Sequence, residues 1–312
     1  MSGEKGLNVS ISKYIFYEGI KQNYVSEFAG RGIAGLCLIL PLMSNEKTAS
    51  IKVDRHVLTS AHLARDVKVD CYAPPGFDHL TDTSLLLVND GQDLVTMRFE
   101  NILDDLYAEG VLQPLLCVGL HCSADRKNEY GTANQPDYKG RGAKAFLYTK
   151  FIFQELLPFL RETYLHHTFS DKAFAGFSLG GLCAMDIVWN YPHEFTKVGV
   201  FSGSFWWRDK DQADADFDED ANRIMHRLVR EGDFASWLKF YFEVGTKDET
   251  ADRNNNGIID AIDDTRSLIE ELVQKGYDRS SDIQYLELEE GKHDVPTWAK
   301  AFPDFLIWGW GR

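Results

Sequence analysis

Two almost unbroken apolar runs, 84–88 and 115–120, constrain the fold of this chain more than any other feature. A strand that is apolar on both sides must be covered on both faces, which is typical of a parallel sheet packed between helices. From about residue 50 onward, segments with strand character alternate with segments of helical spacing. This alternation predicts an α/β fold, with a mostly parallel central sheet and helices on both faces.

The other elements follow from the same patterns of spacing. Further strands are expected at 50–57, 67–72, 173–177, 197–202, 240–245 and 283–288. Helices are expected at 148–164, 179–190, 264–275 and 298–308. No internal repeat or low-complexity linker divides the chain, so we expect one domain over residues 1–312. Within it, residues 1–45 are interpreted as an N-terminal elaboration and residues 204–238 as a cap segment.

The net charge of −15 argues against two classes of partner. Nucleic acids and anionic membranes both require a basic face, so neither is expected to bind this protein. The longest apolar run, 32–43, is too short to span a bilayer and contains Pro41. It also starts too far from Met1 to be typical of a signal peptide. The oligomeric state has no signature in the sequence.

The cysteine content favours a reducing compartment. The chain has an odd number of cysteines and no Cys-x-x-Cys pair, which argues against disulfide or metal chemistry through sulfur. We expect buried, reduced thiols at Cys37, Cys71, Cys117, Cys122 and Cys183. A cytoplasmic location is therefore predicted, and export with a signal that has been removed is the alternative.

A Gly-x-Ser-x-Gly motif at residues 176–180 stands between an expected strand and an expected helix. This motif makes a sharp turn that exposes a serine nucleophile, and it needs small neighbours because the backbone there is strained. Ala175 and Gly181 supply further small side chains around it. We therefore predict Ser178 as a catalytic nucleophile. The alternative interpretation is a glycine-rich turn with an incidental serine.

A serine nucleophile needs a histidine base, and that histidine needs an oriented carboxylate. On this kind of sheet the three groups follow one another in the order Ser, acid, His. Three histidines follow Ser178. His193 ends the elbow helix, too close in sequence to return to the site, and His226 lies in a charged helical stretch. His293 follows the strand 283–288, where a loop at a strand's carboxyl end belongs, so His293 is the predicted base.

The acid should follow the strand 240–245. Asp248 and Glu249 are adjacent in the loop there, and spacing alone does not separate them. An oxyanion hole needs the backbone N–H of the residue after the serine, Leu179, and a second N–H from a loop after an early strand. The Asn-Asp-Gly turn after the strand 84–88 is in the right place, which predicts the N–H of Gln92 as the second donor. The alternative is a plain Asp-Gly turn.

A second motif lies beside the acid and fits a twelve-residue calcium loop, with glycine at its sixth position. The predicted ligands are Asp252, Asn254, Asn256, the carbonyl oxygen of Ile258, Asp260 and Asp263. Aspartate replaces the usual longer glutamate at the last position. The alternative is a solvated turn in which Asp263 caps the next helix. A bound Ca²⁺ would be structural, and the predicted chemistry requires no cofactor.

Four blocks together, 89–93, 175–181, 201–207 and 291–294, resemble the esterase family of α/β-hydrolases. That family includes enterochelin-esterase-like proteins, esterase D, feruloyl and acetylxylan esterases, and mycolyltransferases. The resemblance covers residues 50–310, and the Ser-Gly-Ser-Phe-Trp-Trp block is similar to the enterochelin-esterase-like branch. It implies an α/β-hydrolase fold and agrees with Gln92 in the oxyanion hole. A Gly-Thr-x-Asp context favours Asp248, whereas mycolyltransferases place a glutamate one position later, which keeps Glu249 open.

These features together predict a serine carboxylic-ester hydrolase acting on a small-molecule ester through an acyl-serine intermediate. An aryl, sugar-linked or siderophore ester is the expected substrate. Trp206, Trp207 and Arg126 are candidates for substrate contact; the alternatives are core packing for the tryptophans and a loop salt bridge for the arginine. Two other functions remain open: an acyltransferase using the same triad, and a non-catalytic binding protein on an esterase fold.

Overall fold

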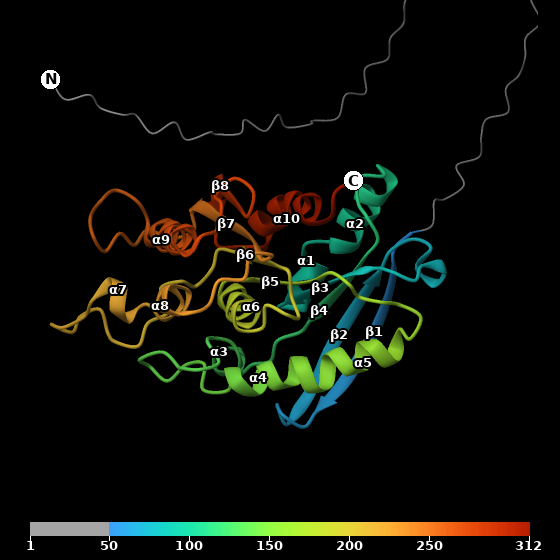
Figure 1. The fold of residues 1–312 in the computed structure, drawn as a ribbon, viewed down its shortest axis with the longest axis horizontal. Helices are drawn as coiled ribbons and strands as arrows, with labels where there is room; N and C mark the ends of the chain where they lie inside the picture. The colour runs from blue at the N-terminus through green and yellow to red at the C-terminus, as the bar shows by residue number, and fades with distance from the viewer. Residues whose placement is uncertain (1–49) are drawn as a thin grey trace, which may run out of the picture. The chain divides into compact units, whose positions relative to one another are not determined.

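The computed structural model describes residues 50–312, which lie within a single compact unit, Lys47–Arg312. The N-terminal elaboration expected for residues 1–45 lies outside the described residues, as do Cys37 and the apolar run 32–43. In the described part, one eight-stranded sheet carries helices on both of its faces (Figure 1). This arrangement confirms the predicted α/β-hydrolase fold class.

The arrangement of the strands accounts for the two kinds of strand sequence. In chain order the strands are β1 (Lys52–Ser60), β2 (Arg65–Ala73), β3 (Ser84–Asn89), β4 (Leu115–Leu120), β5 (Lys172–Phe177), β6 (Lys197–Phe201), β7 (Lys239–Lys247) and β8 (Ile283–Lys292). Their order in the sheet is β1-β2-β4-β3-β5-β6-β7-β8. β2 runs antiparallel to both β1 and β4, and the remaining pairs are parallel. The edge strand β1 alternates in burial, whereas β3 and β4 are buried almost throughout.

Helices cover the two faces of the sheet in separate groups. The helices are α1 (Gly91–Thr96), α2 (Phe99–Ala108), α3 (Arg126–Glu129), α4 (Ala145–Phe151), α5 (Leu157–Thr163), α6 (Leu179–Asn190), α7 (Glu219–Asn222), α8 (Ile224–Glu231), α9 (Asp260–Lys275) and α10 (Val295–Trp310). Helices α4, α5, α6, α8 and α9 contribute side chains to the core on one face, and α1, α2 and α10 to the core on the other. A π-helical turn, Ile152–Leu156, joins α4 to α5.

The structure differs from the sequence-based prediction mainly between β3 and β4. Neither α1 nor α2 is predicted. Helix α1 is only six residues long and begins with a glycine, so it has the composition of a turn. Helix α2 carries a readable signal, because its buried residues Phe99, Leu103 and Leu106 have helical spacing. The short helices α3 and α7 are not predicted either, and α8 is expected only as a charged helical stretch around His226. The predicted helices differ at their ends: α9 begins at Asp260 and α10 at Val295, a few residues earlier than expected.

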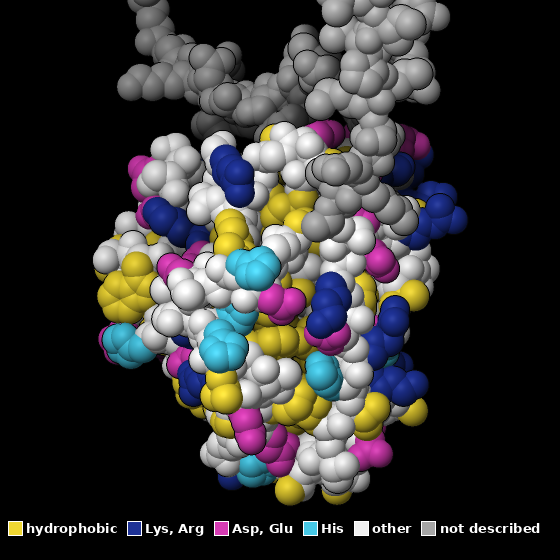
Figure 2. All heavy atoms as spheres, turned by 90° about the vertical axis from the view of Figure 1, so that its right-hand side faces the viewer, with side chains coloured by type: hydrophobic (Ala, Val, Ile, Leu, Met, Phe, Trp, Pro, Cys, Tyr) yellow, Lys and Arg dark blue, Asp and Glu magenta, His cyan; other side chains and the backbone are white. Residues whose placement is uncertain are grey.

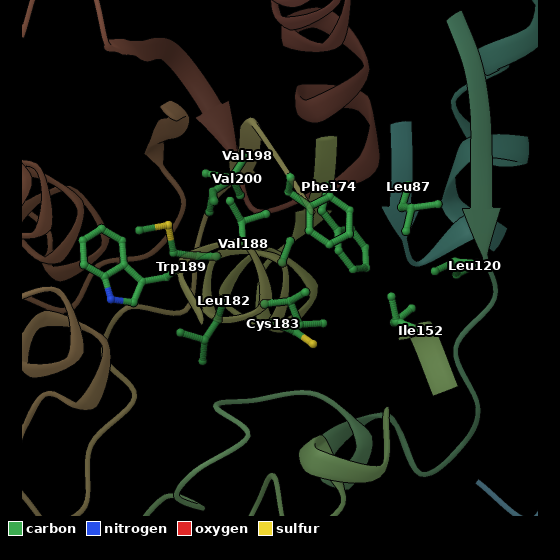
Figure 3. Close-up of a cluster of buried hydrophobic side chains, with 14 of the residues drawn as sticks. Leu87, Leu120, Ile152, Phe174, Leu182, Cys183, Val188, Trp189, Val198 and Val200 are labelled. Atoms are coloured by element: carbon green, nitrogen blue, oxygen red, sulfur yellow. The ribbon is translucent and has the colours of Figure 1, made fainter. Parts of the chain in front are cut away.

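The core beneath the sheet is centred on α6, the helix that follows the serine motif. Figure 3 shows its side chains facing those of the neighbouring strands and of the π-helical turn. The labelled residues are Leu87, Leu120, Ile152, Phe174, Leu182, Cys183, Val188, Trp189, Val198 and Val200. Every residue of α6 except the last is buried. Because interiors are packed as densely as organic crystals, this helix holds its first residue in a fixed position.

Strand β1 forms one edge of the sheet, at the other end from β8, and one side of it is exposed. Figure 2 views this side of the molecule and shows histidine and apolar side chains among charged groups of both signs. Val57 of β1 is 63% exposed, and the ring of His56 packs edge-on against Phe159 with centroids 5.2 Å apart. Charged residues on an edge strand oppose pairing with the strand of another molecule, so β1 is protected from aggregation.

The four cysteines that the structure describes are all free, and the reducing compartment stays a prediction. Cys71, Cys117 and Cys183 are buried and Cys122 is half-buried. Burial raises the pKa of the Cys122 thiol to about 12, so this thiol stays neutral. Among residues 50–312, no helix is both long and apolar enough to cross a membrane.

The segment 204–238, expected to be a cap, belongs in part to the core. Phe205, Ile224 and Val229 are buried, and α8 packs against α9 and α6. The acidic stretch 209–220 is mostly exposed or half-buried. A cap role therefore stays a prediction, and it applies only to the stretch 209–220.

A buried carboxyl group, Asp186, ties α6 to the loop that follows α3. Its carboxylate accepts hydrogen bonds from the backbone N–H of Ala133 at 2.9 Å and from the side-chain amide of Asn190 at 3.1 Å. Burial raises the pKa of Asp186 to about 7, although these two donors lower it. Asp186 therefore titrates near neutral pH in the folded protein.

This shift predicts a specific pH dependence of stability. The folded pKa of Asp186 lies above its ordinary value, so its contribution is fully present below that ordinary value and is lost as pH rises through about 7. We expect Asp186→Asn to flatten the fall in unfolding free energy between about pH 4 and about pH 7. Urea unfolding at a series of pH values measures this. The exposed control Asp105→Asn should keep the native slope, and equal slopes for the native protein and Asp186→Asn would contradict the assignment.

Candidate active site

Ser178 lies at the sharp turn between β5 and α6. Its backbone has φ 56° and ψ −121°, a strained conformation for a residue other than glycine. The turn is held from β6, because the Ser178 N–H donates to the carbonyl of Phe201 at 2.9 Å and the Ser204 N–H donates to the Ser178 carbonyl at 3.2 Å. The hydroxyls of Ser178 and Ser204 lie 3.3 Å apart. Ser178 is half-buried.

The glycines of the motif are required by close packing. A Cβ atom on Gly176 would lie 2.4 Å from the carbonyl carbon of Gly180, and one on Gly180 would lie 2.6 Å from a carboxylate oxygen of Asp90. Both distances are far below van der Waals contact. The serine motif thus packs directly against the Asp-Gly turn that follows β3, as expected for one site at the carboxyl edge of the sheet.

The two predicted oxyanion donors both lie in first turns of helices. Gln92 is in the first turn of α1, and Leu179 is the first residue of α6. Backbone N–H groups at such positions have no partner within their helix and favour negative charge. The turn before Gln92 is left-handed at Asp90, with φ 61° and ψ 46°. This conformation follows from the Asn-Asp-Gly sequence, since aspartate tolerates it better than most residues.

Arg126 joins these two turns. Its guanidinium donates to both carboxylate oxygens of Asp90 at 2.7 Å and to the carbonyl of Phe177 at 3.1 Å. Asp90 is almost fully buried, and the Arg126 side chain is 27% exposed. The loop salt bridge, which was the alternative for Arg126, is therefore formed, because the buried Asp90 carboxylate requires a cation. Substrate contact by Arg126 stays a prediction. The role of Asp90 leaves no signal in the sequence, since its partner lies 36 residues away.

A chain of uncharged hydrogen bonds supports the same turn from the core. The Asn89 side-chain amide donates to the carbonyl of Gly180 at 2.8 Å, and its oxygen accepts from the Tyr148 hydroxyl at 2.6 Å. The Asp90 N–H donates to the Tyr130 hydroxyl at 3.2 Å. Burial raises the pKa of both tyrosines well above the ordinary value, so both hydroxyls remain neutral. These residues fix the distance between the Asp-Gly turn and the elbow.

His293 follows β8 and lies beside the predicted acid. Its Nδ1 is 3.6 Å from a carboxylate oxygen of Asp248, which follows β7. The Asp248 side chain is 1% exposed and that of His293 is 41% exposed. The His293 ring also packs edge-on against Trp298 of α10, with centroids 5.4 Å apart. Apo geometry of catalytic hydrogen bonds is often looser than the working geometry, so 3.6 Å is compatible with a triad contact.

Close packing of backbone also brings the acid loop and the histidine loop together. A Cβ atom on Gly245 would lie 2.4 Å from the carbonyl carbon of Gly291 and 2.6 Å from Oδ1 of Asp248. Only glycine at position 245 leaves room for the Asp248 carboxylate. The glycines of the Gly-Thr-x-Asp pattern (245–248) and of the Gly-x-His pattern (291–293) are therefore both explained by the same close contact between the two loops.

Glu249, the other candidate acid, faces a different element. Burial raises its pKa, and the backbone N–H of Ala261 in α9 lowers it. Its carboxylate therefore lies at the N-terminus of α9, a favourable position for negative charge. The structure brings Asp248, and not Glu249, next to His293.

The two tryptophans have different environments. Trp207 is fully buried, and its indole N–H donates to the Thr132 hydroxyl at 3.1 Å. Substrate contact by Trp207 is therefore corrected to core packing, because a ring without exposed surface cannot touch a ligand. Trp206 is half-buried, and the guanidinium of Arg141 lies 4.8 Å from its ring centroid. Trp206 remains a candidate for substrate contact.

The predicted calcium loop forms a turn held by its own side chains. Asp252 accepts from the backbone N–H groups of Asn256 and Gly257, and Asn256 accepts from that of Ile258. Among residues 50–312, no three His, Cys, Asp or Glu side chains gather as a metal site. The loop would have to rely on amide and carbonyl oxygens as well, which Ca²⁺ accepts. The alternative cap by Asp263 is not formed, because α9 begins three residues earlier at Asp260.

Comparison with known families agrees with the fold. Residues 60–308 match the family described as "Putative esterase", and the chain belongs to this family. The matched range includes the elbow, the acid loop and the His293 loop. The protein is thus a carboxylic-ester hydrolase. Among curated proteins, the uncharacterized protein YbbA of Bacillus subtilis (strain 168) is 24% identical over 263 residues, 81% of this chain and 96% of that protein.

Solved structures show the same fold at low identity. An enterochelin esterase from Shigella flexneri has a TM-score of 0.63 and 20% identity over 82% of this chain, which spans only 57% of that protein's length. A ferulic acid esterase has a TM-score of 0.61 and 18% identity, with 83% of this chain and 97% of the other covered. The siderophore hydrolase EstB from Aspergillus nidulans has a TM-score of 0.59 and 15% identity, covering 89% and 97%.

The Arg126–Asp90 pair yields a prediction for ester turnover. Arg126→Ala leaves a buried carboxylate unpaired and frees the two turns, so kcat should fall roughly tenfold to hundredfold with a small change in KM. Asp90→Asn should act similarly, and the double variant should be no worse than either single one, since the two residues act as a unit. The exposed control Arg266→Ala, which breaks the contact with Glu287, should keep native kcat. Additive losses in the double variant would contradict the coupling.

The calcium loop yields a second prediction. A bound Ca²⁺ would brace the loop that follows Asp248, and at a hundredfold excess over Kd it would stabilise the fold by about 2.7 kcal/mol. We expect thermal melts in calcium and in chelator to separate for the native protein and to coincide for Asp252→Ala. Coincident native melts would reject the metal site.

Proposed function

We propose that this protein is a serine esterase that works through an acyl-serine intermediate on Ser178, with His293 as base and Asp248 as the orienting acid. The observation that carries the proposal is the strained elbow, with Ser178 at φ 56° held by hydrogen bonds from β6. Backbone strain of this kind persists only where the surrounding structure imposes it, and it clusters at functional sites. Asp248 beside His293 supports the same assignment.

The first half of the reaction forms the acyl-enzyme. Ser178 Oγ attacks the ester carbonyl carbon while its proton moves to His293. The carbonyl oxygen becomes an oxyanion that accepts hydrogen bonds from the N–H groups of Gln92 and Leu179. The tetrahedral intermediate then collapses: the bond to the alcohol oxygen breaks, and the departing alcohol takes the proton from His293.

The second half releases the acid. Water gives a proton to His293 and attacks the acyl carbon, which restores the oxyanion in the same pair of N–H groups. Collapse breaks the bond to Ser178 Oγ, which recovers its proton from His293. Asp248 stays ionised throughout and stabilises the imidazolium that forms twice in the cycle.

For the substrate we propose an aryl, sugar-linked or siderophore ester. The solved neighbours named above act, by their names, on enterochelin, ferulic acid and siderophores. In this chain Trp206 is half-buried and stands two residues after Ser204, whose hydroxyl is 3.3 Å from that of Ser178. A half-buried aromatic ring on the loop that follows β6 is suited to contact with a flat or apolar substrate group.

A covalent probe tests the proposal directly. The native protein should react with a fluorophosphonate and hydrolyse p-nitrophenyl acetate, and Ser178→Ala should lose the label and at least a thousandfold of kcat, as a missing triad member does. Ser204→Ala is the matched control, because it removes the neighbouring hydroxyl and should still be labelled. Labelling of Ser178→Ala would place the nucleophile elsewhere.

The same assay separates the two other functions. A native protein that is neither labelled nor active would be a binding protein on this fold. An acyltransferase would instead be labelled, and it would transfer the acyl group to an added alcohol faster than to water. A panel of aryl, acetyl-sugar, feruloyl, catechol-siderophore and glutathione esters then identifies the substrate class from kcat/KM.

A further inference from the structure

A second carboxyl group, Glu243, is buried close to the proposed triad acid. Glu243 lies in β7 and is 1% exposed. Among residues 50–312, neither of its carboxyl oxygens has a hydrogen-bond partner, and the same holds for both oxygens of Asp248. Buried polar groups are almost always hydrogen-bonded, so two adjacent exceptions require an explanation.

The geometry of β7 places the two carboxyl groups on the same side of the strand. Side chains two residues apart in a strand share a face and lie about 6.6 Å apart along it. Glu243 and Gly245 are two residues apart, and a Cβ atom on Gly245 would lie 2.6 Å from Oδ1 of Asp248. The Asp248 carboxylate therefore lies over Gly245, on the face of β7 that also carries Glu243. A glutamate side chain at position 243 is long enough to reach it.

The other neighbours of Glu243 offer it no cation. Its register partners are Phe201 in β6 and Leu286 in β8, both apolar. The preceding residue on its face, Tyr241, donates its hydroxyl to Asp304 of α10 at 3.0 Å. Within the described part of the chain, no Lys, Arg or His forms a salt bridge with Glu243, and the His293 imidazole pairs with Asp248 instead.

An ionised carboxylate in this position would be strongly unfavourable. Moving a charge out of water costs several kcal/mol unless a partner compensates. Burial raises the pKa of Glu243 well above its ordinary value, and the neighbouring Asp248 raises it further. Two carboxyl groups at one site share a single negative charge, as in other carboxyl pairs.

A neutral Glu243 supplies what Asp248 lacks. A protonated carboxyl group has one O–H to donate, and an ionised carboxylate accepts such a bond with about twice the strength of a neutral acceptor. The triad acid of a serine hydrolase is held by hydrogen bonds besides the one from histidine, because its position sets that of the imidazole. Among the described residues, the ion pair formed by the Asp248 carboxylate is with His293 at 3.6 Å.

We propose that Glu243 is a protonated positioning residue that donates its O–H to Asp248, and so holds Asp248 ionised and oriented toward His293. The proposal rests on the function proposed above for Ser178, His293 and Asp248. It adds a fourth residue, a neutral carboxylic acid, to the series Ser178, His293 and Asp248. No proton is lost or gained in the cycle, because Glu243 keeps its proton while Asp248 keeps its charge.

Infrared difference spectroscopy tests the protonation state without reference to activity. The spectrum of the native protein minus that of Glu243→Gln near neutral pH should contain the C=O stretch of a carboxylic acid. Glu287→Gln is the matched control, since Glu287 lies in the neighbouring strand and accepts a hydrogen bond from Arg266 at 2.9 Å. Its difference spectrum should contain carboxylate bands only. Carboxylate bands for Glu243 would overturn the proposal.

Kinetics test the positioning role. Glu243→Gln keeps a donor and the side-chain length, so kcat should stay within a few fold of native. Glu243→Leu keeps the volume but removes the donor, and kcat should fall roughly tenfold to hundredfold with KM little changed. Native kcat in Glu243→Leu, or an equal loss in the Gln and Leu variants, would contradict the role. Should Glu243→Leu fail to fold, the infrared result and Glu243→Gln still decide.

The two proposals fail in different ways. If the native protein is not labelled by the fluorophosphonate, the proposed triad is wrong, whatever the state of Glu243. If it is labelled and active, and Glu243→Leu turns over ester at the native rate, the triad stands and only the role of Glu243 is lost.

Discussion

The site depends on backbone packed directly against backbone at the carboxyl edge of the sheet. Gly180 lies against the Asp-Gly turn after β3, and Gly245 lies against Gly291 between the acid loop and the histidine loop. A side chain at Gly180 or Gly245 would force the turns apart, because its Cβ atom would lie 2.6 Å or 2.4 Å from an atom of the opposite turn. Since catalysis requires reacting groups to be placed within fractions of an ångström, these contacts set the geometry on which everything else in the site is built.

Two buried carboxyl groups next to those contacts are stabilised in opposite ways. Asp90 stays charged because Arg126 binds both of its oxygens. Glu243 has no such cation, and its stable form is the neutral acid. In an acidic protein with a net charge of −15, the distinction matters, because each uncompensated buried carboxylate would add to an already unfavourable repulsion. Asp90 thus holds the Asp-Gly turn through its ion pair with Arg126. Glu243 would hold Asp248 through a hydrogen bond from its protonated carboxyl group.

Much of the fold and the centre of the site follow from local patterns. The strands β3 to β8 and helix α6 are predicted within a few residues, because apolar runs and helical spacing directly reflect burial. Ser178 and His293 follow from the glycine-bordered serine and the order of groups along the chain. The short helix α1 is missed because its glycine start has the composition of a turn. For Arg126 the loop salt bridge is the stated alternative, but its partner Asp90 is not identified, since ion pairs between distant loops leave no spacing signal.

The sequence by itself determined the class of fold, the elbow at Ser178 and the two acidic candidates in the loop after β7, because each depends on residues close together in the chain. Only the tertiary structure distinguishes the surroundings of those candidates: Asp248 lies 3.6 Å from His293, while Glu249 lies at the N-terminus of α9, and Asp248 as the triad acid stays a proposal. It also separated Trp207 in the core from Trp206 near the surface, and it placed Glu243 beside Asp248. These outcomes depend on which face of a strand or loop points inward, and that is settled by packing between elements far apart in the sequence.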